Sequence, residues 1–128
     1  MKYTFCLTAL LVLAGTSRAQ DRVTANDLKQ LGLAYHAYVD ANTKAPPNAD
    51  DLAPFFENSK KLLDHLKSKR IEFFWGVRPV EMTEGTSNTV LAYEKDAPTK
   101  GGFVLYGDGS TRKLSADEFK KATLAKKQ

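Results

Sequence analysis

The chain has 128 residues, of which 27% are charged and 42% are hydrophobic, and its formal net charge is +4. This size suits one small globular domain. One cysteine and two histidines are too few for a cysteine-rich zinc module or a disulfide framework. No apolar stretch approaches the roughly 20 residues that a membrane-spanning helix needs.

The beginning of the chain has the layout of a secretory signal peptide. Lys2 provides a positive start, Phe5–Leu13 is apolar, and small residues precede a cleavage site after Ala19. We therefore expect residues 1–19 to be a signal peptide and residues 20–128 to form a single domain. An uncleaved N-terminal anchor is the alternative.

Cleavage would change the composition of the working protein. It would remove Lys2, Arg18 and the only cysteine, Cys6, and so lower the net charge from +4 to +2. A small net charge, with acidic and basic residues interspersed along the sequence, does not predict a basic surface patch that would bind nucleic acid. We expect no nucleic-acid partner and no integral membrane span after cleavage.

Hydrophobic spacing predicts a long helix over residues 23–41. Four apolar side chains recur at spacings of three or four residues and so share one face: Leu28, Leu31, Tyr35 and Tyr38. Thr24 and Asp27 suggest a capping start without the full capping box. The helix should end before Pro46 and Pro47, which cannot continue it.

Shorter helices should follow the long one. The first is predicted over residues 48–56, capped by Asn48 or Asp50 and interrupted at Pro54. The second should be capped by Asn58, and its apolar side consists of Leu62, Leu63 and Leu66.

The second half has the pattern of an antiparallel sheet. β-Forming residues predict strands over 71–75, 89–94, 102–106 and 111–114. Asp108-Gly109 is a strong hairpin signal between the last two, and either two or three residues could form the turn. Proline and glycine residues predict a loop over residues 77–88 and a turn over residues 95–101.

The last predicted element is a helix that begins at Ser115. Ser115 and Glu118 form a capping box, and Leu114 and Phe119 form a hydrophobic staple. The order of elements predicts an α+β fold: a long N-terminal helix packed on a small antiparallel sheet of three or four strands, with short helices between and a C-terminal helix.

The sequence offers no catalytic constellation. His36 and His65 are the only histidines, and no His-x-x-x-His or Glu-x-x-His spacing supports metal binding or acid–base chemistry. We expect both to be solvated or half-buried on helices. No serine lies in a Gly-x-Ser-x-Gly elbow. We therefore expect a protein that is not an enzyme.

Two aspartates are candidate cation ligands. Asp96 and Asp108, together with Glu94, could offer carboxylate oxygens to Ca²⁺, although their spacing does not match an EF-hand loop. A turn explains Asp108 and Gly109 without a metal. We expect no metal and no cofactor, with Ca²⁺ as the open alternative.

An aromatic side chain and a lysine cluster are candidate binding features. Strand alternation separates Phe74 from Phe73 and Trp75, and directs it towards the helix layer or a partner. The lysines near the C-terminus are expected to form a solvated face: Lys120, Lys121, Lys126 and Lys127.

Two segments resemble a known bacterial group. Residues 26–38 read Asn-Asp-Leu-Lys-Gln-Leu-Gly-Leu-Ala-Tyr-His-Ala-Tyr, and residues 84–94 read Glu-Gly-Thr-Ser-Asn-Thr-Val-Leu-Ala-Tyr-Glu. With the Asp-Gly hairpin, they are similar to type IV pilin-like (pseudopilin-like) proteins that carry a prepilin-processing-associated His…Asp-Gly motif. The matching residues are Gly85, Thr86, Ser87, Asn88, Thr89, Glu94, Asp108 and Gly109.

The chain departs from that group at two points. The position of the motif histidine is occupied by Pro98. The group usually begins with a prepilin leader and a long apolar stem helix, whereas this chain begins with a signal peptide. The resemblance therefore implies a pseudopilin-like head that is exported without a stem.

These observations lead to one expectation and one alternative. We expect a non-enzymatic bacterial domain, exported to the periplasm or the extracellular space, that contacts an envelope or type II secretion-like protein. The alternative is an extracytoplasmic module that binds a cation or a glycan.

Overall fold

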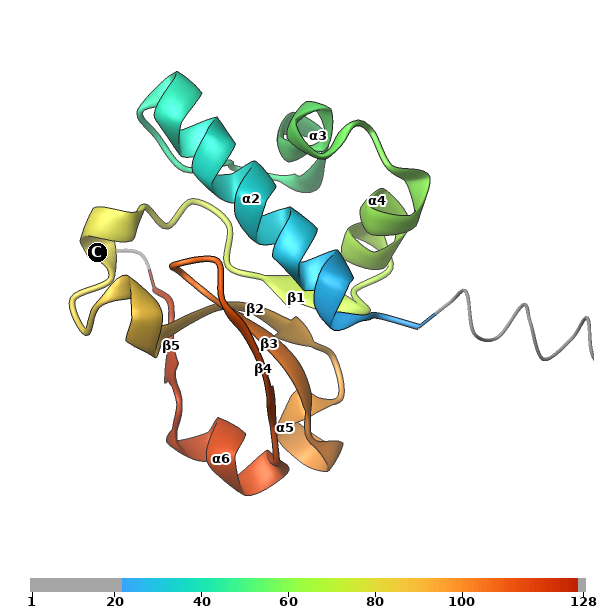
Figure 1. Cartoon of the computed structure of the whole chain (residues 1–128), viewed down its shortest axis with the longest axis vertical. Coiled ribbons are helices and arrows are strands. Elements are labelled where there is room, and N and C mark those ends of the chain that lie inside the picture. The colour runs from blue at the N-terminus through green and yellow to red at the C-terminus, as the bar shows by residue number, and fades with distance from the viewer. Residues whose placement is uncertain (1–21, 127–128) are drawn as a thin grey trace, which may run out of the picture.

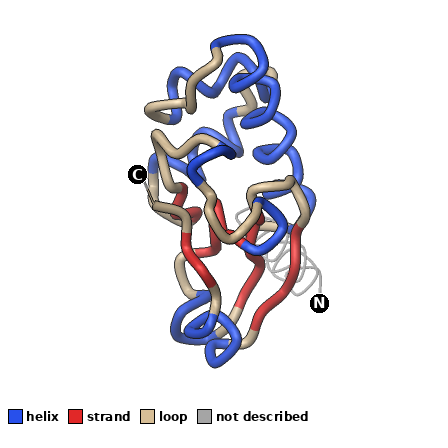
Figure 2. The backbone as a smooth tube through the Cα atoms, turned by 90° about the vertical axis from the view of Figure 1, so that its left-hand side faces the viewer, coloured by secondary structure: helices blue, strands red, loops and turns tan. Residues whose placement is uncertain are grey.

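The computed structural model describes residues 22–126, so the predicted signal peptide and Lys127 lie outside the described residues. The fold is α+β, as the order of predicted elements indicated. Figures 1 and 2 show helices at both ends of the molecule, with the strands between them.

The elements follow the predicted order closely. The helices are α2 (Ala25–Asn42), α3 (Ala49–Leu52), α4 (Lys60–Lys67), α5 (Ala97–Lys100) and α6 (Ala116–Lys121). Short 3-10 helices are η1 (Ala53–Phe56), η2 (Pro79–Glu81) and η3 (Thr86–Asn88). The strands are β1 (Ile71–Phe73), β2 (Thr89–Glu94), β3 (Gly102–Tyr106), β4 (Thr111–Leu114) and β5 (Thr123–Leu124).

Helix α2 begins with a complete capping box, where the sequence suggested a partial one. The Asp27 amide donates to Thr24 Oγ1 at 3.1 Å, and the Thr24 amide donates to Asp27 Oδ2 at 2.9 Å. Aspartate thus takes the place that glutamate usually fills in this motif. The predicted stripe of Leu28, Leu31, Tyr35 and Tyr38 is buried.

The sheet has the strand order β1-β2-β3-β4, all antiparallel. It matches the predicted antiparallel sheet, with one addition. β5 pairs in parallel with Thr89 and Val90, while β1 pairs with Ala92–Glu94. The two strands therefore share one edge of β2. A strand of two residues is too short for an alternation pattern, which is why the sequence did not predict it.

A β-bulge in β2 changes which of its side chains point to each face of the sheet. The register shifts between Val90 and Ala92, so that Leu91 is the extra residue. Leu91 and Ala92 both join the core under α2, with Leu31, Tyr35 and Leu105 among others. Val90 belongs instead to a second core on the opposite face. The long helix and the sheet are held together by the first of these cores (Figure 1).

The second core closes the far face of the sheet with α5 and α6. Phe119 of α6 packs edge-on against Tyr93 with ring centroids 4.8 Å apart. The predicted capping box of Ser115 and Glu118 is present, and Leu114 and Phe119 are buried in the same cluster. The C-terminal helix prediction is therefore confirmed.

Three local predictions were wrong. Strand β1 ends at Phe73, and Trp75 instead stacks on the Phe73 ring at 4.2 Å. Ser59, not Asn58, caps α4, because Asn58 has a left-handed φ of 56°. The segment expected to be a turn contains the one-turn helix α5, and the expected loop over 77–88 contains η2 and η3. Proline within the first turn is compatible with such short helices.

Candidate functional site

Gly85–Thr89, in one of the two segments that resemble pilin-like proteins and that we call the motif for short, folds into a compact turn before β2. Gly85 has a φ of 94°, a conformation that favours glycine. Thr89 Oγ1 donates to the Gly85 carbonyl at 2.8 Å, and Asn88 Nδ2 donates to the Glu84 carbonyl at 3.1 Å. These polar side chains close the turn itself.

The Asp108-Gly109 hairpin turn has three residues, which decides the register that the sequence left open. The Tyr106 amide donates to the Ser110 carbonyl at 2.8 Å, so Gly107, Asp108 and Gly109 form the loop. Gly109 has the predicted positive φ, 91°. Asp108 Oδ1 accepts from the Ser110 amide at 3.0 Å and from its hydroxyl at 2.6 Å. The bond from the Ser110 hydroxyl lowers the pKa of Asp108.

The two motif segments lie against each other. The Gly107 amide donates to the Thr89 carbonyl at 2.9 Å, and the Asp108 amide donates to the Thr86 carbonyl at 3.1 Å. A side chain at Gly107 would collide with Met82, because its Cβ would lie 2.3 Å from Sδ. The fold thus joins motif residues that are about twenty positions apart in the sequence.

Helix α2 supports this contact from the other side. His36 Nε2 donates to the Gly107 carbonyl at 2.8 Å. A Cβ at Gly32 would lie 3.1 Å from Gly109 Cα and 3.0 Å from Leu105 Cδ1. Glycine therefore allows the helix to approach the turn closely. We call this meeting of α2, the 85–89 turn and the 107–110 turn the motif junction.

The remaining motif residue, Glu94, lies away from the motif junction. Its Oε2 accepts the Phe103 amide at 2.5 Å, just beyond the last ladder pair of β2 and β3. A Cβ at Gly102 would lie 2.6 Å from the same oxygen. The carboxylate therefore extends the pairing of the two strands, and it is not part of the motif junction.

The structure does not bring the two candidate cation ligands together. Asp96 precedes α5 and β3, whereas Asp108 follows β3, so the strand separates them. Asp108 is engaged with Ser110. Among residues 22–126, no three His, Cys, Asp or Glu side chains gather as a metal site requires.

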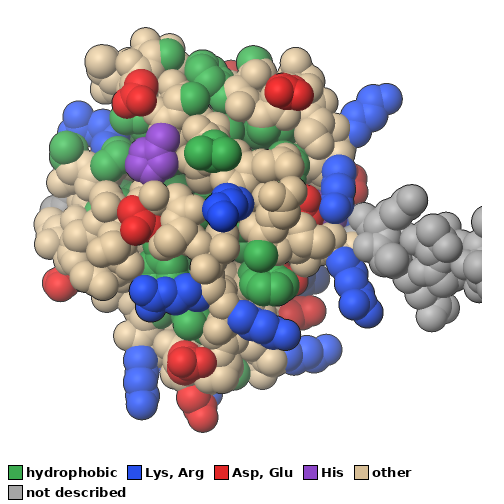
Figure 3. Space-filling view, in the orientation of Figure 1, with side chains coloured by type: hydrophobic (Ala, Val, Ile, Leu, Met, Phe, Trp, Pro, Cys, Tyr) green, Lys and Arg blue, Asp and Glu red, His purple; other side chains and the backbone are tan. Residues whose placement is uncertain are grey.

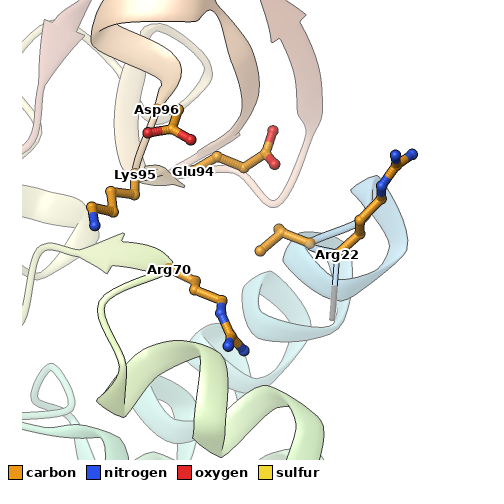
Figure 4. A pocket seen from close by; sticks show the side chains of 6 residues that line it. Arg22, Arg70, Glu94, Lys95 and Asp96 are labelled. Carbon is orange, nitrogen blue, oxygen red and sulfur yellow. The ribbon is translucent and has the colours of Figure 1, made fainter. Parts of the chain in front are cut away.

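A hollow of about 360 Å³ lies beside Asp96. It is lined by Arg22, Val23, Arg70, Glu94, Lys95 and Asp96. Figure 4 shows that the labelled charged side chains point in different directions and do not converge on one point. Arg70 Nη1 is bonded to Asp64 Oδ2 at 3.0 Å, away from the hollow. The arrangement offers charge of both signs, but no preformed coordination geometry.

The prediction for the histidines is correct for His36 and wrong for His65. His36 is half-buried and bonded within the motif junction. His65 is buried, with 1% of its surface exposed. A signal was available in the sequence, since His65 follows Leu62 by three residues and so shares its apolar face. Neither histidine lines the hollow beside Asp96 or the hollow beside Leu33 that is described below.

Phe74 does not form a free aromatic platform. It is half-buried, and its ring centroid lies 5.9 Å from that of Tyr93. Burial raises the pKa of the Tyr93 hydroxyl, with Glu72 as a second cause. Lys120, Lys121 and Lys126 are exposed, as predicted.

A second hollow, of about 520 Å³, lies between α2 and the end of η1 with the residues that follow it. Its lining residues are Gln30, Leu33, Phe55, Phe56, Glu57 and Ser59. Leu33 is 70% exposed, which is unusual for a leucine on a helix whose inner face is packed. Figure 3 shows apolar side chains in small separate patches on one face, with charges of both signs between them.

No protein-family model, curated protein or solved structure significantly matches the chain. Within residues 22–126, none of the helices combines the length and apolarity needed to cross a membrane.

Proposed function

We propose that this protein is an exported bacterial domain, without enzymatic activity, that works by binding an envelope or secretion-system protein. The observation that carries the proposal is the motif junction. Its polar groups bond to the chain's own backbone, and this arrangement supports a structural role for these residues in a pseudopilin-like head. The signal-peptide layout of residues 1–19 supports export.

The outer face of α2 is our candidate for the contact surface. Leu33 is 70% exposed and borders the hollow whose wall includes Phe55 and Phe56. An exposed leucine beside a hollow lined by both apolar and polar side chains offers a protruding side chain and a recess to a partner. Binding there would remove apolar surface from water without disturbing the core under the helix.

Site-specific photo-crosslinking in the envelope fraction tests this proposal. A crosslinker at position 33 should give a defined adduct, and one at Val80, which is 77% exposed on η2, should not. Excess wild-type protein should compete the adduct away, and the Leu33→Lys variant should not. Equal adducts at both positions, or none at position 33, would refute the contact surface.

The alternative, an extracytoplasmic cation- or glycan-binding module, is favoured by the hollow beside Asp96. Three cationic side chains line it together with two carboxylates. Such a charge balance suits an acidic glycan better than Ca²⁺, because the cations repel a metal ion. A ligand that binds only the folded protein raises its melting temperature. Polygalacturonate should then raise the melting temperature of the wild type but not of Lys95→Glu.

A further inference from the structure

His65 has an unusual environment for a histidine. Its side chain is 1% exposed, and neither ring nitrogen has a hydrogen-bond partner among the described residues. The nearest carboxylate oxygen, Asp27 Oδ2, lies 3.8 Å from Nε2, which is too far for a hydrogen bond. A buried polar group without a partner is costly and calls for an explanation.

The carboxylate of Asp27 is already engaged by other groups. The same Oδ2 accepts the Thr24 amide at 2.9 Å and lies 3.2 Å from Lys61 Nζ. It therefore caps α2 and pairs with α4 at the same time. We call Asp27, Lys61 and His65 the latch cluster, because it connects the beginning of α2 to α4.

The charges around the imidazole oppose one another. Burial is the largest influence and lowers the pKa of His65. Arg70 and Lys61 lower it further, while Asp27 and Asp64 act in the opposite direction.

The other elements packed against α4 direct their charges elsewhere. Asp50 of α3 pairs with Lys67 at 2.9 Å, and Glu72 of β1 lies near Tyr93. Neither carboxylate is therefore available to stabilise a charged His65.

Both ends of α4 carry backbone strain. Glu57 and Asn58 before the helix, and Lys69 after it, have φ values of 61°, 56° and 68°. Glu57 and Lys69 each adopt a left-handed conformation that costs about 1 kcal/mol, whereas asparagine tolerates it better. The helix itself is only eight residues long. A short helix between strained connections is an element that can open locally while the sheet stays folded.

We propose that α4 is an acid-released latch: proton uptake by His65 detaches α4 from the beginning of α2. A charged imidazole in this buried position would have no hydrogen-bond acceptor, and the nearest carboxylate oxygen, Asp27 Oδ2 at 3.8 Å, is already paired with Lys61. Moving α4 outwards hydrates the imidazolium and relieves the strained connections. This inference does not depend on the proposed function.

Hydrogen exchange, corrected for intrinsic rates, tests the latch between pH 7.5 and pH 5.5. In the wild type, protection of the amides of residues 62–67 should fall severalfold, with about tenfold as the limit for one proton taken up by one histidine, while β2 and β3 keep theirs. The His65→Leu variant should lose this pH response. The His36→Gln variant changes the other histidine and should behave like the wild type.

Unchanged protection of α4 in the wild type, or the same fall in His65→Leu, would overturn the proposal. A uniform fall along the whole chain would also overturn it, because the opening would then be global. If His65→Leu does not fold, an NMR titration of the wild type tests whether protonation of His65 releases α4. The His65 ring should titrate with a midpoint below 6.5, together with the α4 amide signals, and a midpoint at or above 6.5 contradicts the latch.

Discussion

The motif junction contains a histidine of α2 itself, His36, and the latch cluster contains a histidine of α4, His65, with opposite results. At the junction, His36 donates to a backbone carbonyl, and glycines let three backbone segments approach each other. At the latch cluster, His65 is buried without any hydrogen bond, and long side chains hold the contact. One region is maintained by backbone geometry and the other by side-chain charge.

The difference has a consequence for how each region responds to its surroundings. Backbone hydrogen bonds do not titrate, so the bonds between the 85–89 and 107–110 turns should persist across the pH range in which histidine changes charge. A buried imidazole with a lowered pKa makes the latch cluster sensitive to acid. Substitutions in the core under α2, which supports both regions, should have the largest effect on this contrast.

Leu31→Ala should destabilise both regions, because Leu31 is fully buried in the core that attaches α2 to the sheet. Truncation of a buried leucine costs about 3 kcal/mol. Leu33→Ala is the matched control on the same helix, and its cost should stay below about 0.5 kcal/mol, since Leu33 is 70% exposed. Urea unfolding measures both, and equal losses would contradict the assigned helix face.

Gly109→Val should damage the motif junction by about 2 kcal/mol, since a β-branched residue is strained at positive φ. The backbone conformation is decisive here, because a Cβ at position 109 would lie 4.0 Å from its nearest neighbour, His36 Cδ2, which leaves room for it. Gly109→Asn is the control, because asparagine tolerates this region better. Thermal unfolding should rank the wild type above Asn and Asn above Val, and a silent Val variant would show that the turn can rearrange.

Sequence patterns with a regular period predicted most of the fold. The Leu28 stripe gave the face of α2, and the Ser115 capping box gave the beginning of α6. The Asp-Gly turn was predicted as well, but its length depends on the Tyr106–Ser110 pairing, which a dipeptide does not determine.

Contacts between distant segments could not be read from the sequence. Pairing of β5 with β2 joins Thr123 to Thr89, and no local pattern marks so short a strand. The Gly85–Thr89 and Asp108-Gly109 segments could be singled out from the sequence, but their contact with α2 depends on Gly32, which a hydrophobic periodicity does not mark. The burial of Asp27 likewise follows from the position of α4, which packs over it.

Lowering the pH from 7.5 to 5.5 should reduce the stability of the wild type through the latch cluster. The pKa of His65 is lower in the folded protein than its ordinary value of 6.5, so the unfolded chain binds more protons below that pH. The stability contributed by neutral His65 is therefore complete above about pH 6.5 and falls with acidification. His65→Leu should lose less stability over this range, and His36→Gln should lose as much as the wild type. Urea titrations at the two pH values measure the difference.

Asp108→Asn should have the smallest effect, below about 0.5 kcal/mol near neutral pH. Asparagine keeps an oxygen that can accept from the Ser110 amide and hydroxyl, so the turn retains its bonds. Because the pKa of Asp108 is lowered in the folded protein, its small contribution is present above about pH 4 and falls as acid protonates it. The exposed position keeps that contribution small. Melting temperatures with Ca²⁺ and with chelator provide the check: we expect no chelator effect on either protein. A wild type that melts lower with chelator, beside an unaffected Asp108→Asn, would instead identify Asp108 as a cation ligand.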